Sequence, residues 1–312
     1  LDACRVFQIT GVRKLIDSTA LNSFVTRGNA TRIIWDFDEN TKQTSFERHK
    51  SLHIQQRNVP ELTTEEVFDY LIEKNVFRVG LELECPNCGL KFWLGIKDAT
   101  DEVRCEYCGF LFKLGLQLKH RGDWKFRRSG LFGKDNNQEG AIPVILALMQ
   151  LMRRSDRRGN FVYSTALKLD SSDGINCETD LVVVHPSNEG ADLVIGECKS
   201  NNFEITEEDV QNLTRVKQKV ENSGSIKVYL LFAKTSAFSS DEINRFKQLK
   251  TQGIIPILFS DQDLEPYEAY MDYSLRKVKL PEPYTHNFEG MARNSDFLYL
   301  SNQSSSIEKT TS

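Results

Sequence analysis

The sequence predicts an α/β protein built on a mixed sheet with helices on its faces. From about residue 136 onward, helix-like and strand-like runs alternate in the order αβββαβαβ, and this alternation is typical of a sheet that helices cover. The chain has 312 residues, more than the roughly 100 to 200 of a usual domain. Four of its seven cysteines stand in two close pairs ahead of the α/β region. We therefore expect a further compact part in front of the sheet.

The sequence pattern divides the chain into five parts. They are an N-terminal α+β segment of unreadable role (1–80), the part with the cysteine pairs (81–116), a basic connector (117–135), the α/β core (136–265), and an irregular extension that ends in a disordered serine-rich tail (266–312). In the first part, residues 32–37 predict a strand. Thr63 or Thr64 begins a predicted helix with acidic residues in its first turn.

The core elements are predicted from apolar runs between turn signals. Residues 142–152 form an apolar helix, in which Pro143 is tolerated near the first turn. The other elements are strands at 161–169, 175–185 and 193–200, a capped helix at 206–220, a strand at 227–233, a helix at 240–250 and a strand at 254–259. The turn at 186–192 joins its two flanking strands into an antiparallel hairpin.

The composition indicates a protein that does not insert into a membrane. Hydrophobic residues make up 39% of the chain, and no stretch approaches the roughly 20 apolar residues that span a bilayer. The first residues lack the basic start, apolar run and cleavage site of a secretion signal. The odd number of cysteines, seven, fits metal binding in a reducing compartment better than a disulfide framework. We expect a cytoplasmic protein.

A local positive stripe contrasts with the net charge of −4. From residue 113 to 135, seven lysines or arginines stand against two acidic residues, and further arginines follow at 153, 154, 157 and 158. Because phosphate contacts depend on local charge, such a stripe favours a polyanion. Its candidate nucleic-acid contacts are Lys125, Arg127 and Arg128. A solvated face or a flexible connector explains the same run equally well.

Two short cysteine motifs predict a metal site. Cys85 and Cys88 form one Cys-x-x-Cys, Cys105 and Cys108 form the other, and 16 residues separate them. Each motif is followed by a glycine, which lets backbone amides point toward sulfur. Four thiolates at this spacing favour tetrahedral Zn²⁺, and a closed site of this kind serves structure because it leaves no position for water. The module resembles a zinc ribbon, a kind of module that often contacts nucleic acid or protein.

Acidic residues and a lysine stand on the two strands of the predicted hairpin. Because successive strand residues point to opposite faces, Asp180 lies opposite Cys177, and Glu197 and Lys199 share one face. The hairpin brings these carboxylates and the ammonium together between apolar runs, which is costly without a partner. Mg²⁺ supplies that partner, since it prefers oxygen ligands and keeps several waters. Lys199 then orients or deprotonates an attacking water.

Asp180, followed after 16 residues by Glu197-Cys198-Lys199, resembles the D…ExK signature of the PD-(D/E)xK superfamily. The resemblance covers residues 136–260 and implies a restriction-endonuclease-like fold. It further implies a metal-dependent endonuclease that acts on DNA, in which Asp180 and Glu197 hold Mg²⁺ or Mn²⁺.

The resemblance also implies two further site residues. Members of the superfamily add an acidic residue from the first core helix, which corresponds to Glu139. Some use a glutamine from the helix after the ExK strand, which corresponds to Gln211. The tyrosine that one such subgroup has four residues later is Arg215 here. Many enzymes of this fold cut two strands as dimers, so a homo-oligomer is compatible with the resemblance, and the sequence leaves the oligomeric state open.

Two interpretations of function follow from the sequence. In the first, the protein is a nuclease whose zinc ribbon and positive stripe position DNA, and RNA is the alternative substrate that the sequence leaves open. The N-terminal segment then binds a protein partner, by analogy with effectors of prokaryotic restriction or anti-phage defence. In the second, the protein is a non-catalytic scaffold that binds nucleic acid or protein. Glu-x-Lys triplets also occur as surface pairs on solvated strands. The apolar residues beside Asp180 and Glu197 favour the first interpretation.

Overall fold

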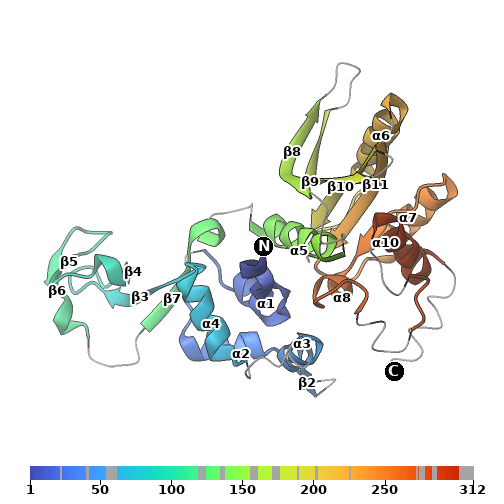
Figure 1. The fold of residues 1–312 in the computed structure, drawn as a ribbon. Helices are drawn as coiled ribbons and strands as arrows, with labels where there is room; N and C mark the ends of the chain where they lie inside the picture. Colours follow the sequence, from blue (N-terminus) through green and yellow to red (C-terminus); the bar gives the residue numbers. More distant parts are fainter. Residues whose placement is uncertain are drawn as a thin grey trace. The chain divides into compact units, whose positions relative to one another are not determined.

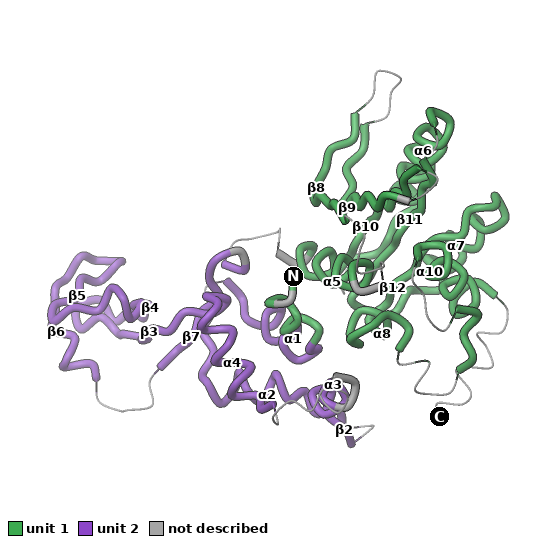
Figure 2. The backbone as a smooth tube through the Cα atoms, in the orientation of Figure 1, with its two compact units in different colours: residues 1–8, 139–312 green, residues 9–138 purple. Residues whose placement is uncertain are grey.

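The chain forms two compact units (Figure 2). Unit 1 comprises Leu1–Gln8 and Glu139–Ser312, and unit 2 comprises Ile9–Gln138. The computed structural model describes residues 1–21, 23–39, 42–53, 62–118, 124–133, 138–154, 161–170, 176–187, 190–200, 203–224, 226–271, 273, 278–282 and 287–301. The cysteine module and the N-terminal segment, which the sequence divides, thus lie in one compact unit. The serine-rich tail expected to be disordered lies outside the described residues from 302 onward.

Unit 1 is built on a five-stranded mixed sheet in the order β12-β11-β10-β9-β8 (Figure 1). Neighbouring strands from β8 to β10 run antiparallel, and those from β10 to β12 run parallel. The strands are β8 (Val162–Asp170), β9 (Asn176–Ser187), β10 (Gly190–Lys199), β11 (Ile226–Lys234) and β12 (Ile257–Phe259). The predicted mixed sheet and the antiparallel hairpin are confirmed.

The helices of unit 1 agree with the prediction as far as residue 260. They are the 3-10 helix η1 (Asp2–Gln8), α5 (Gln138–Arg154), α6 (Glu207–Ser223), α7 (Ser240–Thr251), α8 (Asp261–Leu264), α10 (Phe288–Ser295) and the π-helix η5 (Asp296–Leu300). The stretch after residue 280, expected to be irregular, contains α10. That expectation is wrong because Phe288, Met291 and Ala292 are buried at helical spacing and give the segment an apolar face.

One face of the unit 1 sheet shares its core with α6 and α7. Ile195 of β10 and Phe232 of β11 pack with Leu213 of α6 and Phe246 of α7. The Phe232 and Phe246 rings are stacked with their centroids 4.9 Å apart. Burying each such side chain contributes roughly 1.5–3 kcal/mol. This packing holds α6 against the ends of β9 and β10.

Unit 2 combines helices with three small sheets. The three-stranded sheet has the order β4-β3-β7, and β1-β2 and β5-β6 are two-stranded. The strands are β1 (Phe37–Asp38), β2 (Gln43–Thr44), β3 (Phe77–Glu84), β4 (Lys91–Gly95), β5 (Glu102–Arg104), β6 (Leu111–Lys113) and β7 (Trp124–Arg128). The helices are α1 (Thr10–Ser18), α2 (Arg27–Trp35), α3 (Ser45–His53), α4 (Thr64–Glu73) and the 3-10 helices η2 (Ile96–Asp98), η3 (Leu114–Leu116) and η4 (Gly130–Gly133). The predicted Thr63 cap of α4 is confirmed by a capping box with Glu66.

Two expectations for unit 2 are wrong. The strand expected at 32–37 is the second half of α2, because Thr26 accepts from the Asn29 N–H and begins a helix there. Ala30 and Ile34 are buried four residues apart, and Ile34 crosses so close to α1 that a Cβ on Gly11 would lie 2.1 Å from the Ile34 oxygen. The expected connector at 117–135 contributes β7, which pairs with β3.

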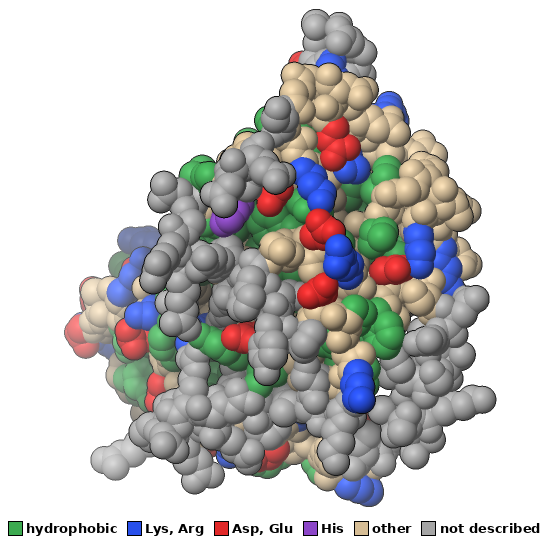
Figure 3. All heavy atoms as spheres, turned by 45° about the vertical axis from the view of Figure 1, so that its right-hand side comes forward, with side chains coloured by type: hydrophobic (Ala, Val, Ile, Leu, Met, Phe, Trp, Pro, Cys, Tyr) green, Lys and Arg blue, Asp and Glu red, His purple; other side chains and the backbone are tan. Residues whose placement is uncertain are grey.

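The charged side chains show no patch of one sign on the face drawn in Figure 3, as far as its described residues go; acidic and basic groups alternate there. Within the described residues, no helix has the length and apolar character that crossing a bilayer requires.

A buried carboxyl group, Asp263, caps α8 and makes the stability of unit 1 depend on pH. Its Oδ2 accepts from the Ser260 N–H at 2.8 Å and from the Tyr299 hydroxyl, while Oδ1 is buried with no partner among the described residues. Burial raises the pKa of Asp263 from 3.8 to about 7. The folded protein therefore keeps a proton that the unfolded chain releases, so this stabilisation is complete below pH 3.8 and is lost as the pH rises toward 7.

We expect Asp263→Asn to remove this dependence. Between pH 4.5 and 6.5, the free energy of unfolding of the parent should fall by about 1 kcal/mol per pH unit relative to the variant. Urea denaturation of both proteins across this range measures the difference. Asp241→Asn, on the first turn of α7, serves as the control and should follow the parent. Parallel curves for the parent and Asp263→Asn would contradict the assignment.

Candidate functional site

The candidate site lies where β9 and β10 stop pairing. Their register ends at Leu181 and Gly196, one residue short of Asp180 and Glu197. Beyond this point, hydrogen bonds from side chains to the backbone connect the two strands. Asp180 Oδ2 accepts from the Cys198 N–H at 2.7 Å, and Thr179 Oγ1 donates to the Gly196 oxygen at 2.9 Å. The separation of the strands thus places a carboxylate beside the Glu197-Cys198-Lys199 segment.

Lys199 is surrounded by carboxylates. Its Nζ lies 2.6 Å from Glu197 Oε1 and 3.5 Å from Asp209 Oδ2. The side chains are largely buried, with exposed fractions of 23% for Lys199 and 12% for Glu197. The structure therefore brings Glu197 and Lys199 together as predicted, and the bond from Asp180 to Cys198 places the third predicted residue next to them.

The electrostatics of the site show an excess of negative charge. Burial raises the pKa of Glu197 to about 7, and the charge of Asp180 adds to this. Burial also raises the pKa of Asp180, against the opposing effects of the Cys198 N–H and Lys199. Burial lowers the pKa of Lys199, but its hydrogen bond to Glu197 and the surrounding negative charges outweigh this and raise it. Several carboxylates facing one ammonium are a setting that a divalent cation stabilises.

The donor set at this site fits Mg²⁺. Asp180 Oδ2 accepts a hydrogen bond from the Cys198 N–H, and Glu197 Oε1 accepts one from Lys199 Nζ. Within the described residues, the second oxygen of each carboxylate, Asp180 Oδ1 and Glu197 Oε2, accepts no hydrogen bond. Two carboxylate oxygens with water completing the shell are a usual arrangement for Mg²⁺. Among the described residues, only the four cysteines form a group of three or more His, Cys, Asp or Glu side chains whose ligand atoms all lie within 4.8 Å of one another. The carboxylates of this site therefore do not surround a metal position by themselves.

Strand alternation, which predicted the site, does not hold along all of β9. Cys177 was expected on the face opposite Asp180, yet it joins the core cluster of Ile195, against which Val182 also packs. The β8–β9 register is the same on both sides of Asp180, but the pair of Ala166 with Asp180, between Thr165↔Leu181 and Leu167↔Thr179, is missing from the ladder. Ala166 has a φ of 53°, a left-handed conformation outside the extended range of a strand.

Asp209 is a site residue whose role the sequence did not reveal. In the capped helix that the sequence predicts from residue 206, Asp209 stands at the position of a capping-box acid, and its Oδ2 accepts from the Thr206 N–H at 2.8 Å. The same oxygen faces Lys199. The signal that could have found it is its place in the first turn of the helix after the ExK strand, because that turn packs near the strand end.

The N-terminus of α6 is fixed by a buried ion pair. Glu242 is fully buried and bonds Lys234 Nζ through both oxygens, at 3.2 and 3.1 Å. The same carboxylate accepts from the Ile205 N–H at 2.8 Å and the Ser239 N–H at 2.7 Å. Ile205 directly precedes the Thr206 cap, so this network holds the turn that carries Asp209 toward Lys199.

We expect Asp209→Asn to separate capping from the role beside Lys199. Asparagine keeps the acceptor for Thr206, so the melting temperature should stay near that of the parent, whereas Asp209→Ala should lose roughly 0.5–1 kcal/mol of stability. Phosphodiester cleavage, the activity proposed below, should fall several-fold in both variants because Lys199 loses a neighbouring charge. Asp209→Asn cutting as fast as the parent would show that Asp209 serves only as a cap.

Glu139 and Gln211 remain predictions. The backbone of Glu139 lies in the first turn of α5, which begins at Gln138, before Pro143. The side chain of Glu139 lies outside the described part of the structure. Gln211 is exposed and donates to Glu207 Oε1 at 2.9 Å. It follows Asp209 by two residues, which places it about 200° further round α6.

The basic residues of β7 have partners inside unit 2. Lys125 Nζ lies 3.8 Å from Glu82 Oε2. Arg127 Nε donates to the Leu21 oxygen at 3.1 Å, and Arg128 donates to the Ile16 oxygen at 2.9 Å. These bonds tie β7 to its surroundings, and nucleic-acid contact by the three residues remains a prediction. Other members of the stripe, at 119, 121, 134, 157 and 158, lie outside the described residues.

The four cysteines form one cluster in unit 2. The sulfur–sulfur distances are 3.6 Å for Cys85 and Cys108 and 3.8 Å for Cys88 and Cys105. Zn–S bonds of about 2.3 Å in a tetrahedron put the sulfurs about 3.8 Å apart, so the cluster fits a bound metal. The glycine after each motif has a positive φ, 70° and 73°, and donates its N–H to the first cysteine of its motif. The two turns are therefore built alike.

We expect a strong chelator to unfold the cysteine module. Its core is small, with Leu83, Phe92, Val103 and Phe112 among its members, and a core of this size depends on its metal. Hydrogen exchange followed by mass spectrometry should show loss of protection across β4, β5 and β6, with β9 and β10 unchanged. Cys88→Ser should reproduce the effect without chelator, and Cys4→Ser, outside the cluster, should not. Protection retained at β5 and β6 would contradict a structural metal.

The chain matches no protein-family model, and no curated protein matches it. Among solved structures, it is similar to the MspJI restriction endonuclease in complex with a 27-mer oligonucleotide, with 12% identity and a TM-score of 0.28 over 56% of this chain and 31% of that chain. It is also similar to EndoMS in the EndoMS–dsDNA2 complex, with 9% identity and a TM-score of 0.26 over 62% of this chain and 89% of that chain. A repair endonuclease from Pyrococcus abyssi is similar as well, with 12% identity and a TM-score of 0.24 over 64% of this chain and 92% of that chain. At these TM-scores, the likeness assigns the chain neither a family nor an activity.

Proposed function

We propose that the chain is a metal-dependent endonuclease that hydrolyses phosphodiester bonds of DNA. The observation that supports this most is the convergence of Asp180, Glu197 and Lys199 at the point where β9 and β10 separate. Buried carboxylates with raised pKa values beside a lysine are a costly arrangement in a sheet, and such arrangements occur chiefly at functional sites.

Each residue has a role in this proposal. Asp180 Oδ1 and Glu197 Oε2 would hold Mg²⁺ or Mn²⁺, and the bound ion would polarise the phosphoryl oxygen. Lys199 donates hydrogen bonds to the attacking water or to the phosphoryl oxygens, where negative charge grows in the transition state. Asp209 positions Lys199. Glu139 is proposed as a further acidic ligand and Gln211 as a polar contact near the site.

The remaining parts would support this activity. The four cysteines would hold a structural Zn²⁺, and Lys125, Arg127 and Arg128 would contact the DNA backbone if their internal bonds exchange for phosphate. A place in a prokaryotic restriction or anti-phage system, a protein partner for the N-terminal segment and a homo-oligomer are part of the same proposal.

A plasmid-cleavage assay tests the proposal. The parent should convert supercoiled DNA to nicked or linear DNA with Mg²⁺ or Mn²⁺ and not with EDTA. Asp180→Asn should not, because asparagine keeps the bond to the Cys198 N–H and loses the charge that holds the metal. Equal cleavage by both proteins would overturn the site assignment. A parent that binds DNA and cuts neither plasmid nor single-stranded substrates would support the non-catalytic scaffold instead.

A further inference from the structure

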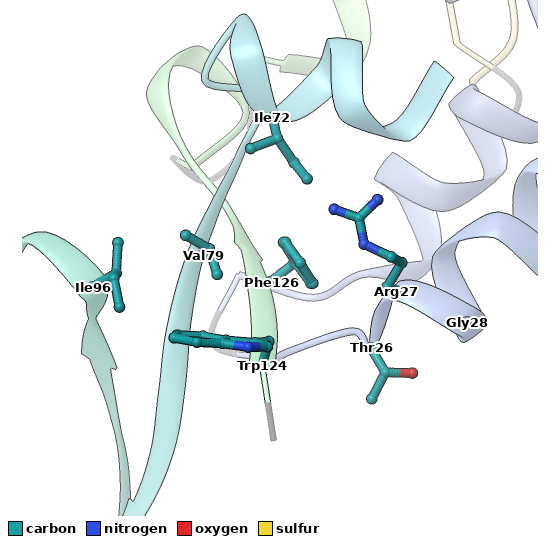
Figure 4. Close-up of a pocket in the computed structure, with 8 residues that line it drawn as sticks. All are labelled: Thr26, Arg27, Gly28, Ile72, Val79, Ile96, Trp124 and Phe126. Atoms are coloured by element: carbon teal, nitrogen blue, oxygen red, sulfur yellow. The ribbon is translucent and has the colours of Figure 1, made fainter. Parts of the chain in front are cut away.

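Unit 2 contains a cavity of about 540 Å³ between its three-stranded sheet and helices α2 and α4 (Figure 4). Val79 and Phe126 are cross-strand partners on β3 and β7 and form the wall behind it. Trp124 lies below them and Ile72 of α4 above, and Arg27 points its guanidinium into the space between. Small-molecule pockets have volumes of about 300–1,000 Å³, so the cavity has room for a ligand of that size.

The walls of the cavity are apolar, and one aromatic ring is open. Trp124 is 44% exposed, whereas Phe126 is 4% exposed and packs edge-on against Phe68 at 5.0 Å between centroids. The Phe68–Phe126 pair belongs to the core and is not available to a ligand. Trp124 precedes Phe126 by two residues on β7, so strand geometry turns both side chains to the same face, toward the cavity. Trp124 therefore offers a flat stacking surface on a supported wall.

A single arginine stands at the side of this surface. The Arg27 guanidinium lies over the Phe68 and Phe126 rings, 5.5 and 5.6 Å from their centroids, and its NH1 donates to Asp69 Oδ1 at 2.6 Å. These contacts fix the guanidinium at the edge of the cavity while its side chain stays 47% exposed. Because a guanidinium carries five N–H donors, donors remain for an anion.

We infer that this cavity binds a nucleotide, with the base stacked on Trp124 and the phosphate on Arg27. Stacking on an aromatic side chain contributes roughly 1–3 kcal/mol per base, and arginine matches the geometry of phosphate. An apolar peptide side chain would fill the same walls but would accept none of the N–H donors that Arg27 has beyond its bond to Asp69. The nucleotide is either free or an unpaired residue of a nucleic acid; in the second form, the inference rests on the proposed function.

Binding is tested on the full chain with Lys199→Met and without added Mg²⁺ or Mn²⁺, so that cleavage plays no part in the result and the cysteine module keeps its metal. The probes are nucleoside 5′-monophosphates, the matching nucleosides, and duplexes with and without one unpaired base. Isothermal titration calorimetry measures the first two and fluorescence anisotropy the duplexes. Trp124→Ala should weaken binding about 5- to 150-fold, which is 1–3 kcal/mol, and Trp124→Phe less. Arg27→Gln should bring the affinity for monophosphates down to that for nucleosides.

The matched control is Trp35→Ala, which removes an exposed tryptophan of the same unit outside the cavity and should leave binding within twofold. Saturable binding of monophosphates indicates a free nucleotide, and preference for the duplex with an unpaired base indicates a nucleic acid. Either result supports the inference if Trp124→Ala weakens the binding. Absence of binding by every probe, or binding that Trp124→Ala and Arg27→Gln leave unchanged, overturns it. Neither result bears on whether the parent cuts DNA.

Discussion

Lys199→Met should reduce the rate of DNA cleavage by about 100- to 1,000-fold, the usual cost of removing one donor aimed at transition-state charge. Methionine keeps most of the length and the apolar stem of lysine, and it removes the ammonium that lies 2.6 Å from Glu197. The carboxylates that would hold the metal stay in place. The rate of single-turnover cleavage at saturating Mg²⁺ measures the effect.

A second lysine provides the matched control for this prediction. Lys217 on α6 is also largely buried and pairs with a glutamate, Glu221, at 2.5 Å, but it lies on the helix and not on the strand end. Lys217→Met should cut DNA within about twofold of the parent after correction for folded protein. If Lys199→Met cuts as fast as Lys217→Met, the ammonium has no part in the reaction.

Glu197→Gln should abolish metal-dependent cleavage and at the same time stabilise the metal-free protein at pH 8. The pKa of Glu197 is about 7 in the folded protein and 4.5 in the unfolded chain. Its contribution to stability is therefore complete below pH 4.5 and is lost as the pH rises through 7. Glutamine resembles the protonated form, so the variant should gain on the order of 2 kcal/mol in free energy of unfolding at pH 8.

The response to Mg²⁺ provides the test. Denaturation at pH 8 should show that Mg²⁺ stabilises the parent, since the ion binds the folded protein alone, and leaves Glu197→Gln unchanged. At pH 5 without metal, the two proteins should be nearly equal in stability. A variant that is less stable than the parent at both pH values would mean that the carboxylate of Glu197 is a structural ion-pair partner of Lys199.

The sequence was informative where a pattern is local. Alternation and the D…ExK spacing placed Glu197 and Lys199 on one face of β10, and the cysteine spacing anticipated the four-sulfur cluster. Local signals failed where packing decides. Residues 32–37 carry strand-like residues, but the Thr26 cap and the contact with α1 at Gly11 make them helical.

Other features depend on residues far apart in the chain. Asp209 acquires its second role only because α6 packs near the end of β10. The cavity of unit 2 combines Arg27, Ile72 and Trp124, whose convergence no spacing rule predicts. The left-handed conformation of Ala166, on β8 opposite Asp180, is predicted by no glycine or turn signal in the sequence.

The buried pair of Lys234 and Glu242 has a consequence for the entropy of binding. Its bonds to Ile205 and Ser239 fix the segments before α6 and α7 while the protein folds. The loss of conformational freedom that orders Asp209 and Lys199 therefore occurs at folding and does not weaken the later binding of an ion or a phosphate. Without the Lys234–Glu242 pair, Asp209 and Lys199 would still be present, but they would lie beside each other in only a small fraction of the folded molecules.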